Sequence, residues 1–222
     1  MEELSHRYRT YALDFWGFGE SDKRRESYNV TDFCSLVDQF MERLGIHSAP
    51  VIGHSMGGTV ALNLALDRPQ LVEKVAVVGS PIDGRSLNPI LKLAGTPWIA
   101  FLVWNSPGLL RIGIKLFAPW IATNWSDWYQ LLMHDLSRMT LESFLGSINS
   151  LHRTNLQPSL FRLRRPVLGV YGRGDRIVNP HQAQLLRAVD GSRIEMLDRS
   201  RHFPMLDEPD TFCSILLSYL AS

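Results

Sequence analysis

Three side chains that together could carry out nucleophilic catalysis stand far apart in the sequence: Ser55, Asp175 and His202. A serine hydroxyl is a weak nucleophile unless a base accepts its proton, and an imidazole with a pKa near neutrality suits that task. The imidazole needs a carboxylate on its other nitrogen, which holds the tautomer and stabilises the imidazolium. Their joint action therefore requires elements that bring three distant segments together.

Ser55 lies in the segment Gly53-His54-Ser55-Met56-Gly57, between a short apolar run and an alanine- and leucine-rich run. The pattern Gly-x-Ser-x-Gly between a strand and a helix predicts a tight turn that exposes the serine at a helix N-terminus. A side chain at Gly53 or Gly57 is expected to collide with neighbouring backbone. The alternative interpretation is a glycine-rich turn with an ordinary serine.

Short apolar segments that alternate with longer amphipathic ones predict the elements that position these residues. The predicted strands are Tyr8–Asp14, the run from Pro50 to the Ser55 turn, Lys74–Val78, Pro166–Tyr171 and Arg193–Leu197, and the predicted helices are Thr31–Leu44, Met56–Asp67, Pro180–Val189 and Asp207–Leu220. This alternation predicts an α/β fold with a mainly parallel sheet flanked by helices. Each of the three candidate residues follows the carboxyl end of a predicted strand, where open α/β sheets form their active sites.

The alternation stops in the middle third of the chain, residues 82–163, which is helical in pattern and rich in aromatic residues. We expect most of these aromatic side chains to form the core of an inserted helical segment, and a smaller fraction to face Ser55 and line an apolar pocket. The aromatic residues are Trp98, Phe101, Trp104, Phe117, Trp120, Trp125, Trp128, Tyr129 and Phe144. The remaining ranges, 1–81 and 164–222, are predicted to form one α/β core.

Four motifs spread over nearly the whole length resemble those of α/β-hydrolases of the capped, lipase- and esterase-like kind. They are Asp14-x-x-Gly17-x-Gly19-x-Ser21-Asp22, Gly53-His54-Ser55-Met56-Gly57-Gly58, Gly172-x-x-Asp175 and His202-x-Pro204-x-x-Asp207-x-Pro209. The resemblance implies that Ser55 is the nucleophile, His202 the general base and Asp175 its orienting acid. It also implies that the Met56 amide is an oxyanion donor and that residues 82–163 form a cap.

The activity implied by this resemblance is that of a serine hydrolase, which cleaves an ester or related acyl bond of a small apolar substrate through an acyl-enzyme and without a cofactor. A carbon–carbon bond hydrolase or a perhydrolase with the same three residues stays open, as does an inactive relative that binds a small molecule or a partner protein. Asp83, which follows the Lys74–Val78 strand, is an alternative to Asp175 as the acid.

One part of the family pattern is missing before residue 8. The family places a strand, a His-Gly motif and a loop there, and the loop amide completes the oxyanion hole. Met1–Ser5 resembles the end of the helix that follows this loop, and Tyr8–Asp14 resembles the next strand. We therefore expect either that Tyr8–Asp14 pairs beside the Ser55 strand or that the chain is a shortened version of a longer protein. Loss of one oxyanion donor typically lowers the rate by about 10²–10³-fold, so slow turnover is expected.

The composition of the chain limits the number of domains, the kinds of partner and the location that we expect. The chain has 222 residues, 45% hydrophobic and 20% charged, and a net charge of +1, which fits one globular domain with an insertion and gives no reason to expect nucleic-acid binding. Two cysteines, Cys34 and Cys213, do not suggest a disulfide scaffold, and together with an N-terminus unlike a signal peptide they favour a cytoplasmic location.

No apolar run is long enough for a membrane span. No pair of histidines, including His134 and His152, has metal-ligand spacing, so no metal is expected. The oligomeric state is left open.

Overall fold

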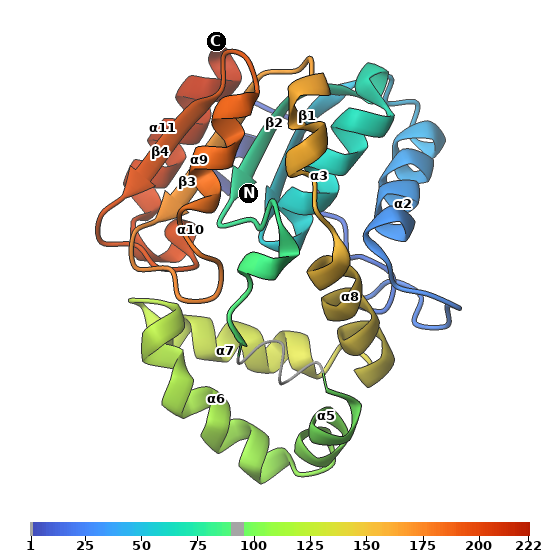
Figure 1. The fold of residues 1–222 in the computed structure, drawn as a ribbon, viewed down its shortest axis with the longest axis vertical. Coiled ribbons are helices and arrows are strands. Elements are labelled where there is room, and N and C mark those ends of the chain that lie inside the picture. Colours follow the sequence, from blue (N-terminus) through green and yellow to red (C-terminus); the bar gives the residue numbers. More distant parts are fainter. Residues whose placement is uncertain (1, 90–95) are drawn as a thin grey trace.

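A single parallel sheet organises the chain. The structure, a computed structural model, describes residues 2–89 and 96–222. Its strands follow the order β1-β2-β3-β4, and every neighbouring pair is parallel. They are β1 (Ala49–His54), β2 (Val72–Val78), β3 (Val167–Gly172) and β4 (Arg193–Leu197). This architecture confirms the predicted α/β class with helices on both faces of the sheet (Figure 1).

Alternate residues of the strands are buried on opposite faces of the sheet. Val75 and Val77 of β2 pack into one apolar cluster, whereas Ala76 and Val78 pack into another. The first cluster is covered by α2 (Val30–Arg43), α3 (Met56–Asp67) and α9 (Gln182–Leu185). The second is covered by α11 (Pro209–Ala221), with α1 (Glu2–Ser5) beside it. The period of two along the strand therefore explains why β2 is apolar without interruption from Val75 to Val78, after the charged Glu73 and Lys74 near its start.

The helices match the predicted segments with shifted ends. α2 begins one residue earlier than expected, because Asn29 is the N-cap and the Asp32 carboxylate accepts a 2.7 Å hydrogen bond from the Asn29 N–H. Gly45 follows the end of α2 with a φ of 66°, as its glycine predicts. The helix expected at Pro180–Val189 is shorter, α9 followed by η4 (Leu186–Ala188). The expected last helix, Asp207–Leu220, corresponds to α11, which begins two residues later at Pro209, and an additional short helix, α10 (Pro204–Asp207), precedes it.

The predicted strand Tyr8–Asp14 is wrong. The segment has no regular secondary structure, and β1 pairs only with β2, so the strand that leads to Ser55 lies at an edge of the described sheet. The side chain of Ile52, on β1, is 40% exposed. A strand requires backbone partners as well as an apolar pattern, and Tyr8–Asp14 makes no ladder. The expected pairing of this segment with the Ser55 strand is therefore also wrong. Met1, the start of the expected N-terminal helix, lies outside the described residues, and α1 covers Glu2–Ser5.

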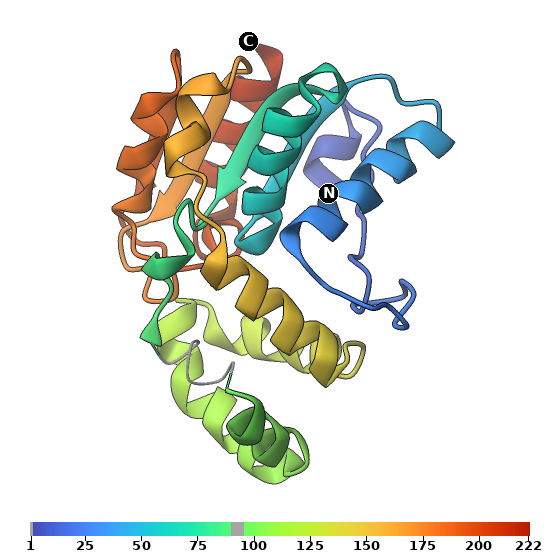
Figure 2. The same ribbon diagram turned by 45° about the vertical axis from the view of Figure 1, so that its right-hand side comes forward.

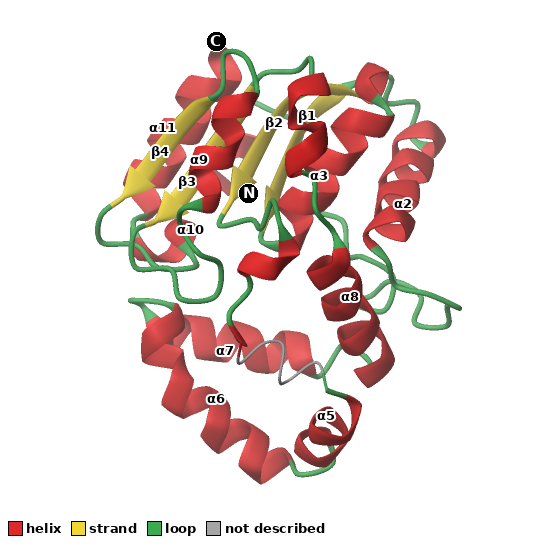
Figure 3. Ribbon diagram, in the orientation of Figure 1, coloured by secondary structure: helices red, strands yellow, loops and turns green. Residues whose placement is uncertain are grey.

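Among the residues that the structure describes, four α-helices lie between β2 and β3, and we refer to them as the inserted helices. They are α5 (Pro97–Trp104), α6 (Pro107–Ile121), α7 (Trp125–Leu136) and α8 (Leu141–Arg153). Short 3-10 turns, η2 (Gly84–Ser86) and η3 (Gln157–Arg162), flank them, and η1 (Pro69–Leu71) precedes β2. The strand arrows in Figure 3 point toward the inserted helices, which lie below the sheet in Figure 2. Residues 90–95 of the range predicted as an insertion, 82–163, lie outside the described residues.

Most aromatic side chains of the inserted helices are exposed, contrary to the expectation that they would form a core of their own. Trp128 is buried, at 5% exposure, and packs against Ala118 and Ala122. The exposed ones are Trp98, Phe101, Phe117, Trp120 and Trp125. The inserted helices therefore leave most of these rings in contact with solvent and do not enclose them in a separate core.

Two further properties concern the chain as a whole. Both cysteines are free thiols, and burial raises the pKa of Cys34 to about 11. Within residues 2–89 and 96–222, none of the helices combines the length and the apolarity that crossing a bilayer requires.

Candidate active site

Ser55 stands at a strained turn between β1 and α3. Its φ of 52° and ψ of −120° place a non-glycine residue in a region that L-residues rarely adopt. Its N–H donates to the Val78 carbonyl at 2.8 Å, which ties the turn to the end of β2. Met56 begins α3, so its N–H is one of the four that a helix leaves without an intrahelical acceptor. The geometry is that of a serine presented at a helix N-terminus, as the sequence predicts.

The glycines around Ser55 differ in how much space they leave. A Cβ on Gly53 would lie 2.2 Å from the backbone carbon of Gly57, so glycine is required at position 53 as expected. A Cβ on Gly57 would meet no heavy atom within 4 Å, and the collision expected there is wrong. A collision does arise at the next residue, because a Cβ added to Gly58 would lie 1.9 Å from the Ser80 Oγ. The tight approach is therefore between the start of α3 and the residues after β2.

His202 and Asp175 form a buried pair at the carboxyl ends of the strands. The His202 Nδ1 and the Asp175 Oδ2 are 2.8 Å apart, and the two side chains are 5% and 0% exposed. Because an ionised carboxylate only accepts, Nδ1 carries the proton in this hydrogen bond. The neutral His202 ring then has its Nε2 unprotonated, and that atom is able to accept a proton.

The second oxygen of Asp175 is fixed by backbone groups. Its Oδ1 accepts hydrogen bonds from the N–H groups of Ile177 and Val178, at 2.8 and 2.9 Å. Gly79, with a φ of 54°, passes so close that a Cβ there would lie 3.3 Å from the His202 Nδ1. The carboxylate is thus held on one side by its own loop and on the other by the histidine.

The alternative acid, Asp83, lies elsewhere. Its carboxylate pairs with the Arg85 guanidinium at 2.8 Å and accepts from the Arg85 N–H at 2.9 Å. The hydrogen bond from Arg85 is the largest cause that lowers the pKa of Asp83. Of the two carboxylates weighed from the sequence, Asp175 is the one that contacts His202 in this structure.

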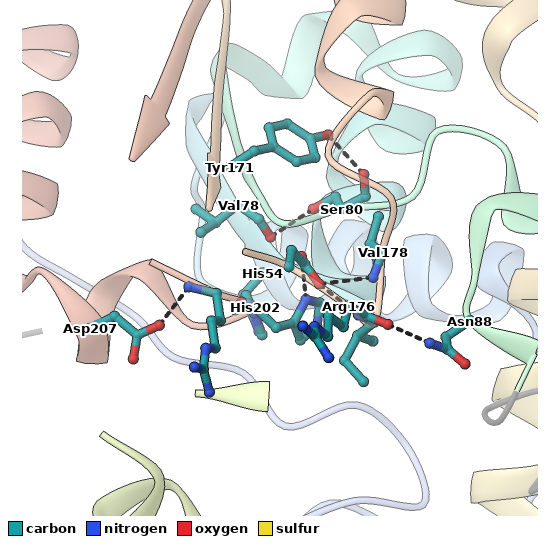
Figure 4. Close-up of polar contacts among 12 residues, drawn as sticks. His54, Val78, Ser80, Asn88, Tyr171, Arg176, Val178, His202 and Asp207 are labelled. Atoms are coloured by element: carbon teal, nitrogen blue, oxygen red, sulfur yellow. Dashed lines mark hydrogen bonds and ion pairs between the residues drawn. The ribbon is translucent and has the colours of Figure 1, made fainter. Parts of the chain in front are cut away.

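His54, the neighbour of Ser55, connects β1 to the His202 loop. Its Nε2 lies 2.8 Å from the His202 carbonyl oxygen, which can only accept, so Nε2 carries the proton of the neutral ring (Figure 4). Its ring also lies 4.8 Å from the His202 ring and 4.6 Å from the Phe203 ring, centroid to centroid. Burial, and then the proximity of His202, lowers the pKa of His54 to about 3. A neutral His54 therefore brings the turn that carries Ser55 next to His202.

Ser55 itself makes no side-chain hydrogen bond to any residue that the structure describes. His54, the preceding residue, contacts the His202 carbonyl, so the turn that carries Ser55 lies next to the His202 loop. In unliganded enzymes the hydrogen bond between nucleophile and base is often long and shortens only with substrate. The three candidate residues thus lie at the same end of the sheet, and the His–Asp hydrogen bond is the one that is formed.

The inserted helices hold the His202 loop through backbone hydrogen bonds. The His202 N–H donates to the carbonyl of Ile121, the last residue of α6, at 3.0 Å. The Asp207 carboxylate accepts from the N–H groups of Thr123 and Arg201, each at 2.7 Å, and from that of Asn124 at 3.2 Å. Asp207 therefore joins the α6–α7 connection to the loop that carries His202.

Sequence reasoning missed two of these contributions. Asp207 was identified only as part of a motif, and its position three residues after Pro204 does not reveal which N–H groups it accepts from. The hydrogen bond from His54 to the His202 carbonyl depends on a contact between distant segments, which the sequence pattern does not contain. Another buried polar contact, from the Tyr171 hydroxyl to the Ser80 carbonyl at 2.8 Å, supports the same end of the sheet (Figure 4).

The motif Asp14–Asp22 forms a closed loop against α8. The Asp14 Oδ2 accepts from the Glu20 N–H at 3.0 Å, and Gly19, with a φ of 52°, packs directly on that carboxylate. The Ser143 hydroxyl of α8 donates to the Gly17 carbonyl at 2.9 Å. These contacts close the loop on itself and attach it to α8.

Metal binding receives no support within the described ranges. They contain no group of three or more His, Cys, Asp or Glu side chains arranged to hold an ion. Of the two cap histidines considered from the sequence, His152 is close enough to Asp83 to contribute, as the smallest cause, to lowering its pKa.

Known proteins resemble this chain over nearly its whole length. A family model described as the alpha/beta hydrolase family matches residues 1–215. A 2-hydroxy-6-oxononadienedioate/2-hydroxy-6-oxononatrienedioate hydrolase of Comamonas testosteroni is 27% identical over 97% of this chain and 78% of its own length. A putative carbamate hydrolase of Serratia proteamaculans is 24% identical over 98% of this chain and 82% of its own. The solved structure of a thermophilic esterase from Thermogutta terrifontis superposes with a TM-score of 0.82, at 18% identity, over 99% of this chain and 82% of its own.

Proposed function

Because this chain belongs to the alpha/beta hydrolase family and is an enzyme with hydrolase activity, we propose that it cleaves an ester or related acyl bond with Ser55 as the nucleophile. The observation that carries the proposal is the buried pair of His202 and Asp175, 2.8 Å apart, next to the Ser55 turn. The substrate is a small molecule with an apolar acyl or leaving group, since apolar rings such as Phe203 lie beside His202.

The proposed reaction proceeds through an acyl-enzyme. The Ser55 Oγ attacks the carbonyl carbon while the His202 Nε2 accepts the hydroxyl proton, and the Met56 N–H donates to the developing oxyanion. The tetrahedral adduct collapses, and the imidazolium returns the proton to the leaving group. His202 then deprotonates a water that attacks the acyl-enzyme, which releases the acid and restores the Ser55 hydroxyl.

Asp175 supports both halves of this reaction. Its carboxylate keeps the proton on the His202 Nδ1, so that Nε2 faces the nucleophile as a base. It also stabilises the imidazolium once the proton has been transferred, because the pair is shielded from water. The backbone bonds from Ile177 and Val178 hold the carboxylate in place for this role.

The proposed role of residues 82–163 is that of a cap over this site. The inserted helices lie at the end of the sheet that carries Ser55, Asp175 and His202, and α6 contacts the His202 backbone through Ile121. Such a cap excludes water and shapes the space next to the nucleophile.

The first test is the intact mass of the purified chain after incubation with a fluorophosphonate. This reagent reacts with an activated serine and leaves an adduct that resembles the tetrahedral intermediate. We expect a single adduct on the wild-type chain and none on Ser55→Ala. A folded wild-type chain that forms no adduct would instead support an inactive, ligand-binding relative, and it would contradict the proposed mechanism.

A second candidate is hydrolysis of a carbon–carbon bond. It is favoured by the relative from Comamonas testosteroni, whose name gives 2-hydroxy-6-oxononadienedioate as its substrate. The same three residues would serve, because an acyl-enzyme or a water activated by His202 can both release the acid. Rates on a panel of p-nitrophenyl esters and on a vinylogous diketone distinguish the two, since we expect turnover of esters to exceed that of the diketone.

A further inference from the structure

We propose that α5 and α6 bind the surface of a membrane that contains anionic phospholipids. The proposal is based on large apolar side chains of these two helices that are exposed to solvent. On α5, Trp98 is 65% exposed, Phe101 58% and Leu102 57%. On α6, Ile112 is 60% exposed and Leu116 71%. We call these five residues the apolar face. Large apolar side chains that gather on a surface in this way are typical of an interaction site.

Helical spacing brings these side chains together in two rows. Trp98 is three and four residues before Phe101 and Leu102, so the three lie on one side of α5. Ile112 and Leu116 are four residues apart and share one side of α6. α5 and α6 are consecutive helices, and Figures 1 and 2 show them together at the end of the molecule farthest from the sheet. That position leaves them accessible to a flat surface.

Two cations stand beside the apolar row of α6. Arg111 and Lys115 each precede a member of that row by one residue, and both are exposed. Neither forms an ion pair with another residue in the described ranges. A helix with an apolar row flanked by Lys or Arg is suited to lie in the interface, with its rings at the level of the headgroups and its cations on the phosphates.

The charge of the surrounding sequence has one sign. From Arg85 to Ser126 the chain holds four basic residues and no aspartate or glutamate. The segment therefore carries four positive charges and no negative one, whereas the whole chain has a net charge of +1. An anionic membrane surface attracts such a segment electrostatically in addition to burying its apolar side chains.

A second copy of the chain would complement the charge of this surface less well than an anionic membrane would. A symmetric dimer through the apolar face would place Arg111 and Lys115 of both copies near one another, with no carboxylate from this segment to neutralise them. Lipid phosphates would neutralise these cations.

The test measures binding to vesicles of phosphatidylcholine with and without phosphatidylglycerol by co-sedimentation. Trp98→Ser/Leu116→Ser removes apolar surface, and Arg111→Gln/Lys115→Gln removes charge. The matched controls are Phe161→Ser, whose ring is 66% exposed on η3, and Arg162→Gln/Arg164→Gln, also exposed. Thermal unfolding of each variant checks that it is folded.

We expect the wild-type chain to bind vesicles with phosphatidylglycerol, and to bind pure phosphatidylcholine vesicles less. The apolar double variant should bind at least about tenfold more weakly. Each lost cation should weaken binding to the anionic vesicles about fivefold, and should have little effect on neutral ones. Vesicles with brominated acyl chains should quench the tryptophan fluorescence of the wild type.

Two outcomes would overturn the proposal. The first is no sedimentation of the wild type with anionic vesicles, and the second is an equal loss of binding in the control variants. If sedimentation velocity then shows a wild-type dimer and a monomeric Trp98→Ser/Leu116→Ser variant, the apolar face is an interface between two copies. The vesicle assay does not depend on catalysis, so its outcome is independent of whether Ser55 is the nucleophile.

Discussion

The backbone N–H of His202 donates a 3.0 Å hydrogen bond to the carbonyl of Ile121. The first residue belongs to the loop between β4 and α10, and the second closes α6, so the inserted helices contact the backbone of the proposed base directly. A movement of α6 would therefore move the backbone of His202. The inserted helices thus contribute a backbone contact to the proposed site.

Asp207 is expected to be a positioning residue for this contact. Its carboxylate accepts hydrogen bonds from the N–H groups of Thr123, Asn124 and Arg201. The substitution Asp207→Ala removes this acceptor from all three donors. We expect a loss of about 1–3 kcal/mol in the free energy of unfolding. We also expect fluorophosphonate labelling of Ser55 to slow, with the labelling rate measured well below the unfolding temperature. Asp210→Ala, on the exposed side of α11, is the control and should change neither quantity.

Replacing each candidate acid in turn distinguishes Asp175 from Asp83 as the carboxylate that acts with His202. Asp175→Asn keeps the shape but favours the wrong His202 tautomer, which in a Ser-His-Asp site lowers kcat by about 10⁴-fold. The measurement is the steady-state rate on the best ester of the panel. Asp83→Asn removes a carboxylate that pairs with Arg85 and should leave the rate within about a factor of two or three. A large loss of activity in Asp83→Asn and none in Asp175→Asn would reverse the assignment.

The two glycines beside Ser55 should respond differently to alanine. Gly53→Ala would force the new Cβ onto the Gly57 backbone, and we expect a loss of about 1–3 kcal/mol or more in the free energy of unfolding. Gly57→Ala adds a Cβ into open space within α3, so its stability should be unchanged or higher by up to about 1 kcal/mol. Chemical denaturation of both variants measures the difference. Equal destabilisation would contradict the geometry of the turn.

The buried His54 predicts a specific loss of stability in acid. Its pKa in the folded chain is about 3, against an ordinary value of 6.5, so the unfolded chain binds the extra proton between these values. The contribution of His54 is fully present above about pH 6.5 and decreases as the pH falls toward 3, by at most about 1.4 kcal/mol per pH unit.

The test of this pH dependence uses chemical denaturation of His54→Gln between about pH 4 and 7. Glutamine provides an N–H donor near the position of Nε2 but does not titrate. The slope of stability against pH should be smaller than in the wild type by up to one proton. His47→Gln is the control, because His47 is exposed, and its slope should match that of the wild type. A His54→Gln slope equal to the wild-type slope would show that His54 does not titrate as described.

The sheet, its crossover helices and the approximate place of the candidate residues could be predicted from local patterns. Ser55, Asp175 and His202 each follow a strand that contains an apolar run, and parallel strands bring such ends to one edge. The acid could not be decided from the sequence, since Asp83 also follows a strand. Its pairing with Arg85 depends on the path of the turn after β2.

Two failures have a common physical reason. The segment Tyr8–Asp14 has the apolar content of a strand, and Trp98 and its neighbours have the apolar content of a core. Apolar content predicts that burial is favourable, but not that a partner surface is present to provide it. Whether a ring such as that of Trp98 is covered depends on the arrangement of distant helices, which the sequence pattern does not contain.

The edge position of β1 has a consequence for how the fold opens. The strand that leads to Ser55 is held in the sheet by β2 alone, whereas β3 has neighbours on both sides. Local opening in a native protein starts where the fewest contacts must break, so amide protons of β1 should exchange faster than those of β3. The strain at Ser55 adds to this difference. The proposed nucleophile therefore lies at the boundary of the cooperative unit, and a molecule that covers this edge would stabilise the Ser55 turn before the rest of the fold.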